Sequence, residues 1–293
     1  MRAEQYQRQL DDVTAYIYAH LDDDLDLSIL AEVARFSPYH WHRVYRAVRG
    51  ETAAQTVQRL RLERAAAMLV ETSLPVGRIA RRAGFGRAET FGRALVRAYG
   101  LTPSALRSSG SLPEAAATTT ETTAHAGVAA VDVEIRELAP AVLAVAPHHG
   151  DYLAIGKAFA HVRDRMPAPS GVPRSTDPRL GVAVPGDLVA VYRDDPGATP
   201  AAALRSWAGV VLAADAELPE GLERRTIPGG RHAVLRYVGP YSAMHRAYRS
   251  LYGAWLPASG HAPRDEPVFE IYRTDPATTR PTAAVTEIVL PVA

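Results

Sequence analysis

Apolar residues recur at helical spacing through the first 107 residues of the chain. In SPYHWHRVYRAVRG, residues 37–50, one face of the predicted helix carries Trp41, Val44, Tyr45 and Val48. Ser37 can cap this helix, Pro38 suits its first position, and Gly50 can end it. The amphipathic stretch LSILAEVARF lies just upstream, so the pattern predicts two helices joined by a short turn, a helix-turn-helix.

The same pattern occurs again at residues 76–100, VGRIARRAGFGRAETFGRALVRAYG. It predicts a helix over 76–83, a turn at Gly84, and a second helix that buries Phe91, Leu95 and Tyr99. Residues 52–71, between the two units, read as one continuous helix about 30 Å long. One turn of B-DNA is about 34 Å, so this helix suits two DNA-reading helices in successive major grooves.

The pattern changes after a stretch without either periodicity. Residues 108–128, SSGSLPEAAATTTETTAHAGV, have the composition of a linker. Beyond them, helical stretches alternate with strand-like runs, among them VEIRELAPAVLAVAP, HAVLRYVG and AVTEIVLPV. We therefore predict a multi-domain chain, with an all-α double helix-turn-helix domain at 1–107, a flexible linker at 108–128 and an α+β domain at 129–293.

The second domain contains an internal repeat. HHGDYLAIGKAF (148–159) aligns with YVGPYSAMHRAY (237–248), PAPSG (167–171) with LPASG (256–260), and VYRDDP (191–196) with IYRTDP (271–276). Each half reads as strand, helix, strand, strand. The repeat predicts two β-α-β-β units related by a pseudo-twofold axis, with a cleft of the kind that ligands favour between them.

Charge is distributed unevenly along the chain. Residues 35–107 carry 14 arginines against four glutamates, whereas residues 1–34 have a net charge of −6 and residues 108–293 a net charge of −3. A basic block in one domain indicates a polyanionic partner, and the alternative is a solvated arginine face.

Several classes of site and location are excluded or disfavoured. The chain has no cysteine, which excludes disulfides, thiolate nucleophiles and thiolate metal sites. The histidines lack metal-ligand spacing, HExxH and GxSxG are absent, and GDYLAIGKA departs from the phosphate-binding loop. We expect no cofactor and no metal. The start of the chain is not of signal-peptide type and no apolar run of about 18 residues occurs, so we expect a cytoplasmic protein without a membrane partner.

The N-terminal motifs carry a family resemblance. LAEVARFSPYHWHRVYRAVRG, the LRLERA helix, the IA…GF unit and the GLTP…R ending resemble the DNA-binding domain of AraC/XylS-type transcription regulators over about residues 8–107. Arg35 stands where that family usually has a small turn residue. The resemblance implies that double-stranded promoter DNA is a partner.

The resemblance also implies which residues read DNA. Base-edge contacts fall at Tyr39, His42 and Arg43 in the first reader and at Glu89 and Arg93 in the second, with Thr90 beside them. Arg46, Arg87 and Arg97 are expected at phosphates, and His40 is expected to be structural. For Arg43 and Arg93, a phosphate contact or an intramolecular salt bridge stays open as the alternative.

Residues 129–293 resemble the GyrI-like small-molecule-binding domain. HGDY, GDLVAVYRDDP, PGGRHAVLRYVGPY, LYGAWLPASG and PVFEIYRTDP carry this resemblance. Joined to an AraC-type reader, such a domain gives the arrangement of Rob-type activators. The resemblance implies that the domain binds a small-molecule effector and that its binding is of the multidrug type.

Glu270 is the candidate centre of the effector site. In PVFEIY it shares a strand face with Val268 and Tyr272, and a buried carboxylate needs a partner. A hydrophobic cation would supply one, and by the resemblance the corresponding glutamate lies at the centre of the pocket. Ala190 is its counterpart in the other half. The other candidates for the effector site are Tyr152, Tyr241, Trp207 and Tyr272, whereas Tyr248 and Trp255 are expected in the core. The alternative for Glu270 is an arginine partner or contact with water.

Two functions from different classes follow from this reading. The first is a ligand-responsive transcription regulator and not an enzyme, with RNA polymerase as a further candidate partner. The second is a hydrolase of reactive small molecules on a DNA-binding anchor, in which Glu270, near Tyr241, serves as base.

Overall fold

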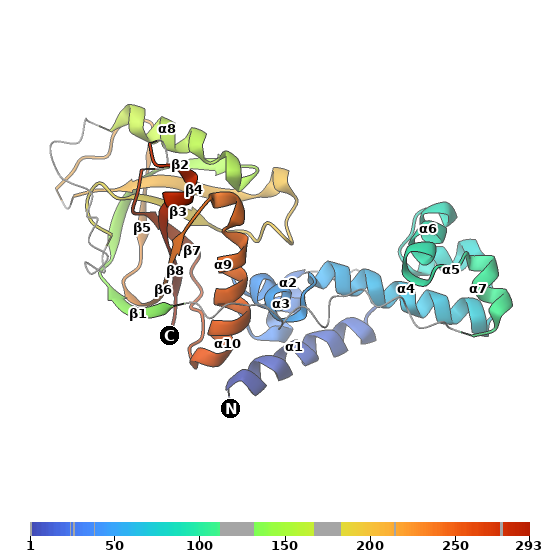
Figure 1. Ribbon diagram of the computed structural model, residues 1–293. Coiled ribbons are helices and arrows are strands. Elements are labelled where there is room, and N and C mark those ends of the chain that lie inside the picture. Colours follow the sequence, from blue (N-terminus) through green and yellow to red (C-terminus); the bar gives the residue numbers. More distant parts are fainter. Residues whose placement is uncertain are drawn as a thin grey trace. The chain divides into compact units, whose positions relative to one another are not determined.

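The computed structural model describes residues 2–23, 25, 27–37, 39–111, 132–166, 183–213, 215–275 and 278–293 (Figure 1). These residues form two compact units. The first contains residues 3–35 and the described part of 45–127; the second contains Phe36–Val44 together with the described part of 128–293. Pro38, residues 112–131 and the repeat segment PAPSG lie outside the described residues, and so do the predictions made for them.

Helices make up the first unit. They are α1 (Arg2–Ala19), α2 (Leu27–Ala34), α4 (Ala53–Glu71), α5 (Val76–Arg82), α6 (Ala88–Tyr99) and α7 (Pro103–Ser109). Helix α3 (Trp41–Arg49) begins in the second unit and ends in the first. The expected helical character of this region is confirmed, and α7 extends two residues into the predicted linker.

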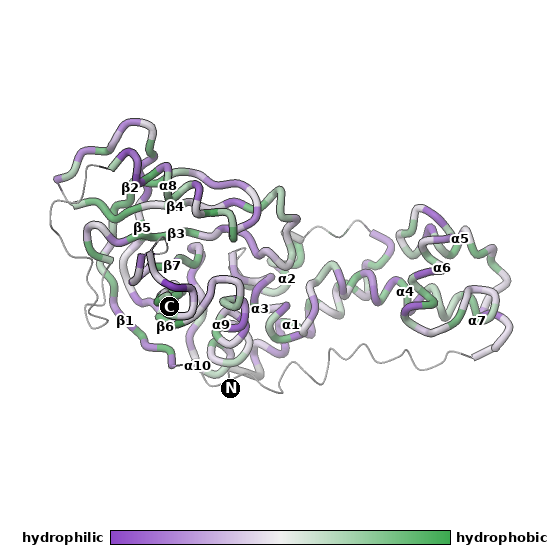
Figure 2. Tube along the Cα trace, turned by 45° about the horizontal axis from the view of Figure 1, so that its top comes forward, coloured by the Kyte–Doolittle hydropathy of each residue, from purple (hydrophilic) through white to green (hydrophobic). Residues whose placement is uncertain are grey.

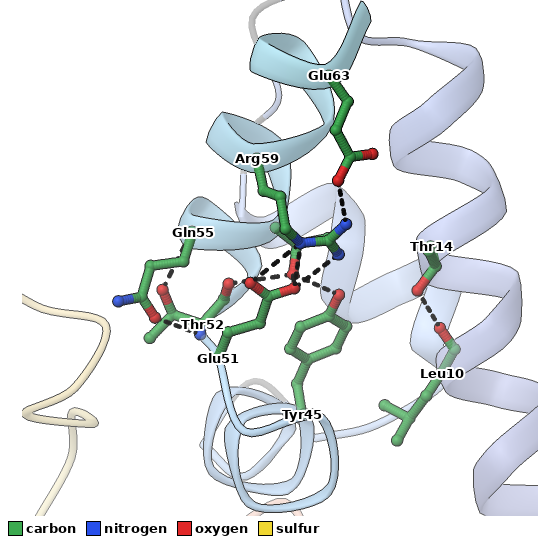
Figure 3. A network of polar contacts seen from close by, with 9 residues as sticks. Leu10, Thr14, Tyr45, Glu51, Thr52, Gln55, Arg59 and Glu63 are labelled. Atoms are coloured by element: carbon green, nitrogen blue, oxygen red, sulfur yellow. Dashed lines mark hydrogen bonds and ion pairs between the residues drawn. The ribbon is translucent and has the colours of Figure 1, made fainter. Parts of the chain in front are cut away.

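Helix α4 is the continuous helix that the sequence predicts. Its start is fixed by a capping box, in which the Thr52 hydroxyl accepts from the Gln55 amide and the Gln55 side chain accepts from the Thr52 amide (Figure 3). Arg59, one turn further along, binds Glu51 at 2.8 Å and Glu63 at 3.0 Å. These contacts hold the helix start to the turn before it.

The second helix pair also follows its prediction. Gly84 adopts a φ of +77° between α5 and α6, a left-handed conformation that favours glycine. Phe91 and Leu95 of α6 are fully buried, and Tyr99 packs against the same core cluster. Helical periodicity alone therefore located the buried face of this helix.

The start of α3 differs from its prediction. The helix begins at Trp41, and the Ser37 carbonyl accepts from the amides of His40 and Trp41 in the turn that precedes it. The Ser37 hydroxyl also accepts from the Tyr39 amide at 3.3 Å, so Ser37 caps this turn as the sequence predicts, although the helix itself begins at Trp41. Gly50 ends the helix as expected, with a φ of +76°.

The second unit is built on one antiparallel sheet of eight described strands. Their order is β1-β6-β8-β7-β3-β4-β2-β5. The bounds are β1 (Val133–Leu138), β2 (Ala141–His149), β3 (Leu188–Tyr192), β4 (Arg205–Val211), β5 (Glu223–Ile227), β6 (Gly230–Val238), β7 (Val268–Tyr272) and β8 (Val285–Pro291). The order is preserved when each strand is exchanged for its counterpart and the sheet is read from the other edge.

Each half contains one strand more than predicted. The run VEIRELAPAVLAVAP forms two strands, β1 and β2, because the chain breaks at Ala139–Pro140, and proline cannot donate to a ladder. Each half is therefore strand, strand, helix, strand, strand. The helices are α8 (Gly156–Arg165) in the first half and α9 (His245–Ser250) in the second, where a π-helical turn (Leu251–Trp255) and α10 (Leu256–Ser259) continue it.

The two faces of the sheet bury different chemistry. Val189, Phe269, Ile271 and Val289 belong to a hydrophobic cluster on one face, and the central strands β3 and β7 are coloured largely hydrophobic in Figure 2. Alternation along β7 sends Glu270 and Tyr272 to the other face, where Phe159 of α8 meets Tyr272 with ring centroids 5.2 Å apart. This face holds the candidate site.

Candidate functional site

Glu270 occupies the centre of the sheet. It lies on β7 directly opposite Ala190 of β3 on one side and Ile288 of β8 on the other. Its residue is 4% exposed, and Ala190 is fully buried. The two positions that the repeat identifies as counterparts therefore lie side by side, one with a carboxylate and the other with a methyl group.

Three tyrosine hydroxyls surround the Glu270 carboxylate. Tyr248 donates to Oε1 at 2.8 Å, while Tyr272 at 2.9 Å and Tyr192 at 3.3 Å donate to Oε2. The hydroxyls of Tyr192 and Tyr272 are themselves 2.9 Å apart. Glu270 and these three residues are called the tyrosine shell below. Among the described residues, no ion pair includes Glu270, so neither alternative raised from the sequence, an arginine partner or water, describes this arrangement.

Burial and hydrogen bonding act on Glu270 in opposite directions. Burial raises the pKa of the Glu270 carboxyl above its ordinary value, and the hydrogen bonds from the three phenols oppose that rise. The phenol pKa values of Tyr192, Tyr248 and Tyr272 are raised well above the usual range, because they are buried and because Glu270 is close. The phenols therefore stay protonated and act as donors.

Two further sequence-predicted tyrosines line this shell. The ring of Tyr152 lies 4.7 Å from that of Tyr192, and the ring of Tyr241 lies 5.7 Å from that of Tyr272. Tyr152 and Tyr241 begin corresponding short 3₁₀ turns, Tyr152–Ala154 and Tyr241–Ala243, before the helices of the two halves. The repeated turns thus bring one tyrosine from each half to the same group.

Trp207, the remaining predicted effector residue, is not brought to this group. It pairs with Val191 on β3, one residue away from Ala190, so it projects to the opposite face and packs against the hydrophobic cluster there. Arg225 and Arg193 lie over its ring at 4.8 and 5.4 Å from the centroid. The one-residue difference in register explains the difference from the prediction.

Sequence reasoning missed Tyr192 and placed Tyr248 in the core. Tyr192 lies two residues after Ala190, so strand alternation could have placed it beside Glu270. Tyr248 had no such signal, because an aromatic residue on a helix looks the same whether it lines a pocket or fills a core. The structure shows it half-buried with its hydroxyl on Glu270.

A second buried carboxylate lies close by on the opposite face. Glu287 of β8 pairs with Ile271 in the ladder, and its Oε2 accepts from Arg273 at 2.7 and 3.0 Å. Arg136 donates to its other oxygen at 2.9 Å. Arg273 also binds Asp187 at 2.8 Å, so this face carries a connected ion network.

The residues expected to read DNA in the first helix pair differ in exposure. Arg46 is exposed, Tyr39 and His42 are partly exposed, and Arg43 is buried at 7%. Arg43 donates to the carbonyl oxygens of Tyr39 at 2.8 Å and Asp194 at 2.7 Å, contacts that lie within the second unit. His40, expected to be structural, is fully buried.

The second helix pair presents its predicted residues to solvent. Arg87, Glu89, Thr90 and Arg93 are all exposed on α6 and at its start. Further exposed arginines on α5 and α6 are Arg78, Arg81, Arg82 and Arg97. A basic exposed face beside a buried apolar one is suited to contact with a phosphate backbone.

Two other kinds of site are absent from the part of the chain that the structure describes. It contains no group of three or more histidine, aspartate or glutamate side chains placed to hold a metal ion. None of its helices combines the length and apolar character that a membrane crossing needs. The described candidates are therefore the tyrosine shell and the exposed face of α5 and α6.

Two family models match separate parts of the chain. Residues 131–293 match the model of the GyrI-like small molecule binding domain, and residues 30–109 match that of a helix-turn-helix domain. The first match covers more than half of the chain.

Individual relatives and solved structures match parts of the chain. The chain is 30% identical over 102 residues to the regulatory protein SoxS of Escherichia coli (strain K12), a match that covers 35% of this chain and 95% of SoxS. It is 30% identical over 105 residues to the bifunctional transcriptional activator/DNA repair enzyme AdaA of Bacillus subtilis (strain 168), covering 36% of this chain and half of AdaA. Among solved structures, the EcmrR C-terminal domain shares 17% identity at a TM-score of 0.43, over 56% of this chain and 98% of that domain.

Proposed function

The chain belongs to the GyrI-like family and joins its small-molecule-binding domain to an AraC-type helix-turn-helix domain, and from this premise we propose a transcription regulator that responds to a hydrophobic cation. The observation that carries the proposal is the tyrosine shell, where a buried carboxylate receives three hydroxyl hydrogen bonds and takes part in no ion pair among the described residues.

The chemistry of the shell favours a cationic group. Phenol hydroxyls stabilise a carboxylate by hydrogen bonding, but they leave its negative charge in place. The rings around it add the attraction of aromatic faces for cations, which is strongest where water is excluded. Because Glu270 is only 4% exposed, the ligand reaches it by displacing a phenol, and the half-buried Tyr248 is the one we propose to move.

The repeat supports the same proposal. The strand order is preserved when the two halves are exchanged, which supports the predicted pseudo-twofold duplication. Tyr152 and Tyr241 enter the shell from corresponding turns, whereas only one half supplies a charge, at Glu270 opposite Ala190. We propose that Tyr152, Tyr241 and Tyr272 bind the apolar part of the effector and that Trp207 acts only through the core.

DNA binding is proposed to use both readers. Arg93 and Glu89 of α6 are exposed and suited to base edges, with Thr90 beside them and Arg87 at a phosphate. In the first reader, Tyr39, His42 and Arg43 are proposed at base edges and Arg46 at a phosphate. RNA polymerase is a further proposed partner, in keeping with a transcription activator.

Titration calorimetry of the full chain with two probes tests the effector class. Tetraphenylphosphonium is a hydrophobic cation, and triphenylphosphine oxide is a neutral molecule of similar bulk. We expect the cation to bind and Glu270→Gln to weaken it at least tenfold while changing the neutral probe little. Glu223→Gln, at an exposed position on β5, is the matched control. An equal loss for both probes would refute the charge pairing.

A hydrolase is the second candidate, because burial raises the pKa of Glu270 toward the range that suits a general base. Turnover of an activated ester that disappears in Glu270→Gln and persists in Glu223→Gln would favour this function. Binding of tetraphenylphosphonium without any turnover would favour the regulator.

A further inference from the structure

The segment Phe36–Val44 packs within the second unit through His40. The His40 ring is fully buried, with Nε2 at 2.7 Å from the Glu266 carbonyl oxygen and Nδ1 at 2.9 Å from the Tyr252 hydroxyl. A carbonyl only accepts, so Nε2 carries the proton and Nδ1 accepts from Tyr252, which gives a neutral imidazole. Burial, followed by the charge of Arg43, lowers the pKa of His40 to about 3, in agreement with the neutral form.

Arg43 makes the second connection. Its Nη2 donates to the Asp194 carbonyl at 2.7 Å and its Nη1 donates to the Tyr39 carbonyl at 2.8 Å. A base-edge contact to guanine uses the same terminal nitrogens of arginine. Each of these nitrogens keeps a second N–H, but Arg43 is only 7% exposed, so it cannot reach a base while it stays in this position.

Both connections lead to the tyrosine shell. The ring of Tyr252 is stacked on that of Tyr248, with centroids 6.4 Å apart and planes 8° apart, and Tyr248 donates to Glu270. The Asp194 carbonyl that binds Arg43 also accepts from the Tyr152 hydroxyl at 3.1 Å, and Tyr152 packs on Tyr192. The segment thus rests on the two tyrosine pairs that enclose the carboxylate.

We propose that the outer side of the tyrosine shell is the docking surface for Phe36–Val44, so that effector binding and DNA reading by the first helix pair are coupled through Tyr252 and Tyr152. This coupling rests on the proposed function. When a cationic effector displaces Tyr248, Tyr252 loses its stacking partner. The Tyr252 hydroxyl that donates to His40 Nδ1 is then no longer held in place. The segment then detaches, Arg43 becomes free to contact a base, and the apparent DNA affinity rises with the fraction of detached segment.

Tyr252→Phe tests the docking without replacing a residue predicted to contact DNA. It removes the hydroxyl that binds His40 and keeps the buried ring. Tyr237→Phe is the control, because its hydroxyl makes one 2.8 Å bond to the Pro240 carbonyl in the same unit. With a labelled duplex selected from a random pool by the full chain, we expect Tyr252→Phe to bind about three- to tenfold more tightly, the equivalent of one hydrogen bond. Tyr237→Phe should leave the affinity unchanged.

A second variant guards against a local packing defect. Asp265→Ala removes the exposed carboxylate that accepts from the Ser37 hydroxyl at 2.8 Å and alters no buried group. We expect a smaller increase in DNA affinity, about twofold, in the same direction. If neither variant increases DNA affinity over Tyr237→Phe, the docking does not restrain DNA reading and the proposal fails.

Hydrogen exchange of the peptide 36–44, with and without tetraphenylphosphonium, separates the proposal from the proposed function. Faster exchange with the cation supports the coupling. Unchanged exchange while calorimetry shows Glu270-dependent binding overturns the coupling and leaves the effector site intact. If the cation does not bind but Tyr252→Phe tightens DNA binding, the docking stands and the proposed effector class fails.

Discussion

Glu270 and Glu287 lie on neighbouring strands, within one residue pair of each other along the ladder. They project to opposite faces of the sheet and accept hydrogen bonds from different kinds of donor. Glu287 accepts hydrogen bonds from two arginines, Arg273 and Arg136. Glu270 accepts from three phenols. Both carboxylates are buried, at 1% and 4% exposure, so burial alone does not distinguish them.

The difference lies in charge, not in the number of hydrogen bonds. Arginine donors neutralise Glu287. Phenol donors solvate Glu270 without neutralising it, so the attraction for a further cation persists in a water-poor place. A carboxylate held by neutral donors in a sheet centre is therefore a better guide to a binding site than a buried acid as such.

The largest effect is expected for Glu287→Gln. It leaves the buried Arg273 and the half-buried Arg136 beside a neutral amide, and breaking a buried pair in this way costs about 3–5 kcal/mol of unfolding free energy. Urea unfolding followed by tryptophan fluorescence reports on the second unit, which contains Trp41, Trp207 and Trp255. Glu223→Gln, whose partner Arg225 is exposed, should cost less than about 1 kcal/mol. Equal costs would remove the distinction between the two kinds of pair.

Tyr248→Phe should have an intermediate effect. It deletes one hydroxyl that donates to a charged acceptor at 2.8 Å, a loss of about 1.5–3 kcal/mol. Tyr237→Phe deletes a bond of the same length to a neutral carbonyl and should cost about 1 kcal/mol. The same urea unfolding measures both. If Tyr248→Phe costs no more than its control, the phenols do not stabilise a charged carboxylate.

Glu270→Gln should change the free energy of unfolding less than Glu287→Gln or Tyr248→Phe does. The amide oxygen still accepts from phenols, and the variant also removes the cost of burying a charge, so we expect a change within about 1.5 kcal/mol. A loss as large as that of Glu287→Gln would show that Glu270 has a structural role. The distinction drawn between the two carboxylates would then not hold.

The smallest effect concerns pH. Because the pKa of Glu270 is raised on folding, the folded state holds this proton more tightly than the unfolded state does. Its contribution to stability is complete below the ordinary value of 4.5 and is lost as pH rises through the folded pKa. Above pH 4.5, the original chain should lose stability relative to Glu270→Gln, while its affinity for tetraphenylphosphonium should rise. Parallel stability curves for the two proteins would contradict the raised pKa.

Much of this architecture was predictable from local patterns. Period-two alternation in PVFEIY gave the correct face for Glu270, and helical periodicity gave α4 and the buried side of α6, because these properties depend only on neighbours in the chain. Local patterns could not place Trp207 on the other face, because its face depends on how β4 is registered against β3. Tyr248 could not be placed from the sequence, because an aromatic residue that lines a site and one that fills a core differ only in what they contact, whereas strand alternation does point to Tyr192.

The docking of Phe36–Val44 could not be foreseen from the sequence. His40 forms a hydrogen bond with Tyr252, which lies 212 positions away in the sequence, and Arg43 forms one with Asp194, 151 positions away. The resemblance assigned this segment to DNA, and nothing local indicates a second partner. Arg35, just before it, adopts a φ of +54°, so the departure from a small turn residue noted in the sequence corresponds to a strained backbone.

Ala190, directly opposite Glu270, sets a limit on what the proposed site can hold. Paired positions on adjacent strands have Cβ atoms about 5 Å apart, so the methyl group occupies the place where a second acidic side chain would stand. The centre of the sheet accordingly offers one carboxylate, and therefore a partner for one positive charge. A ligand with two cationic groups would find a partner for the first there and would leave the second to the solvent.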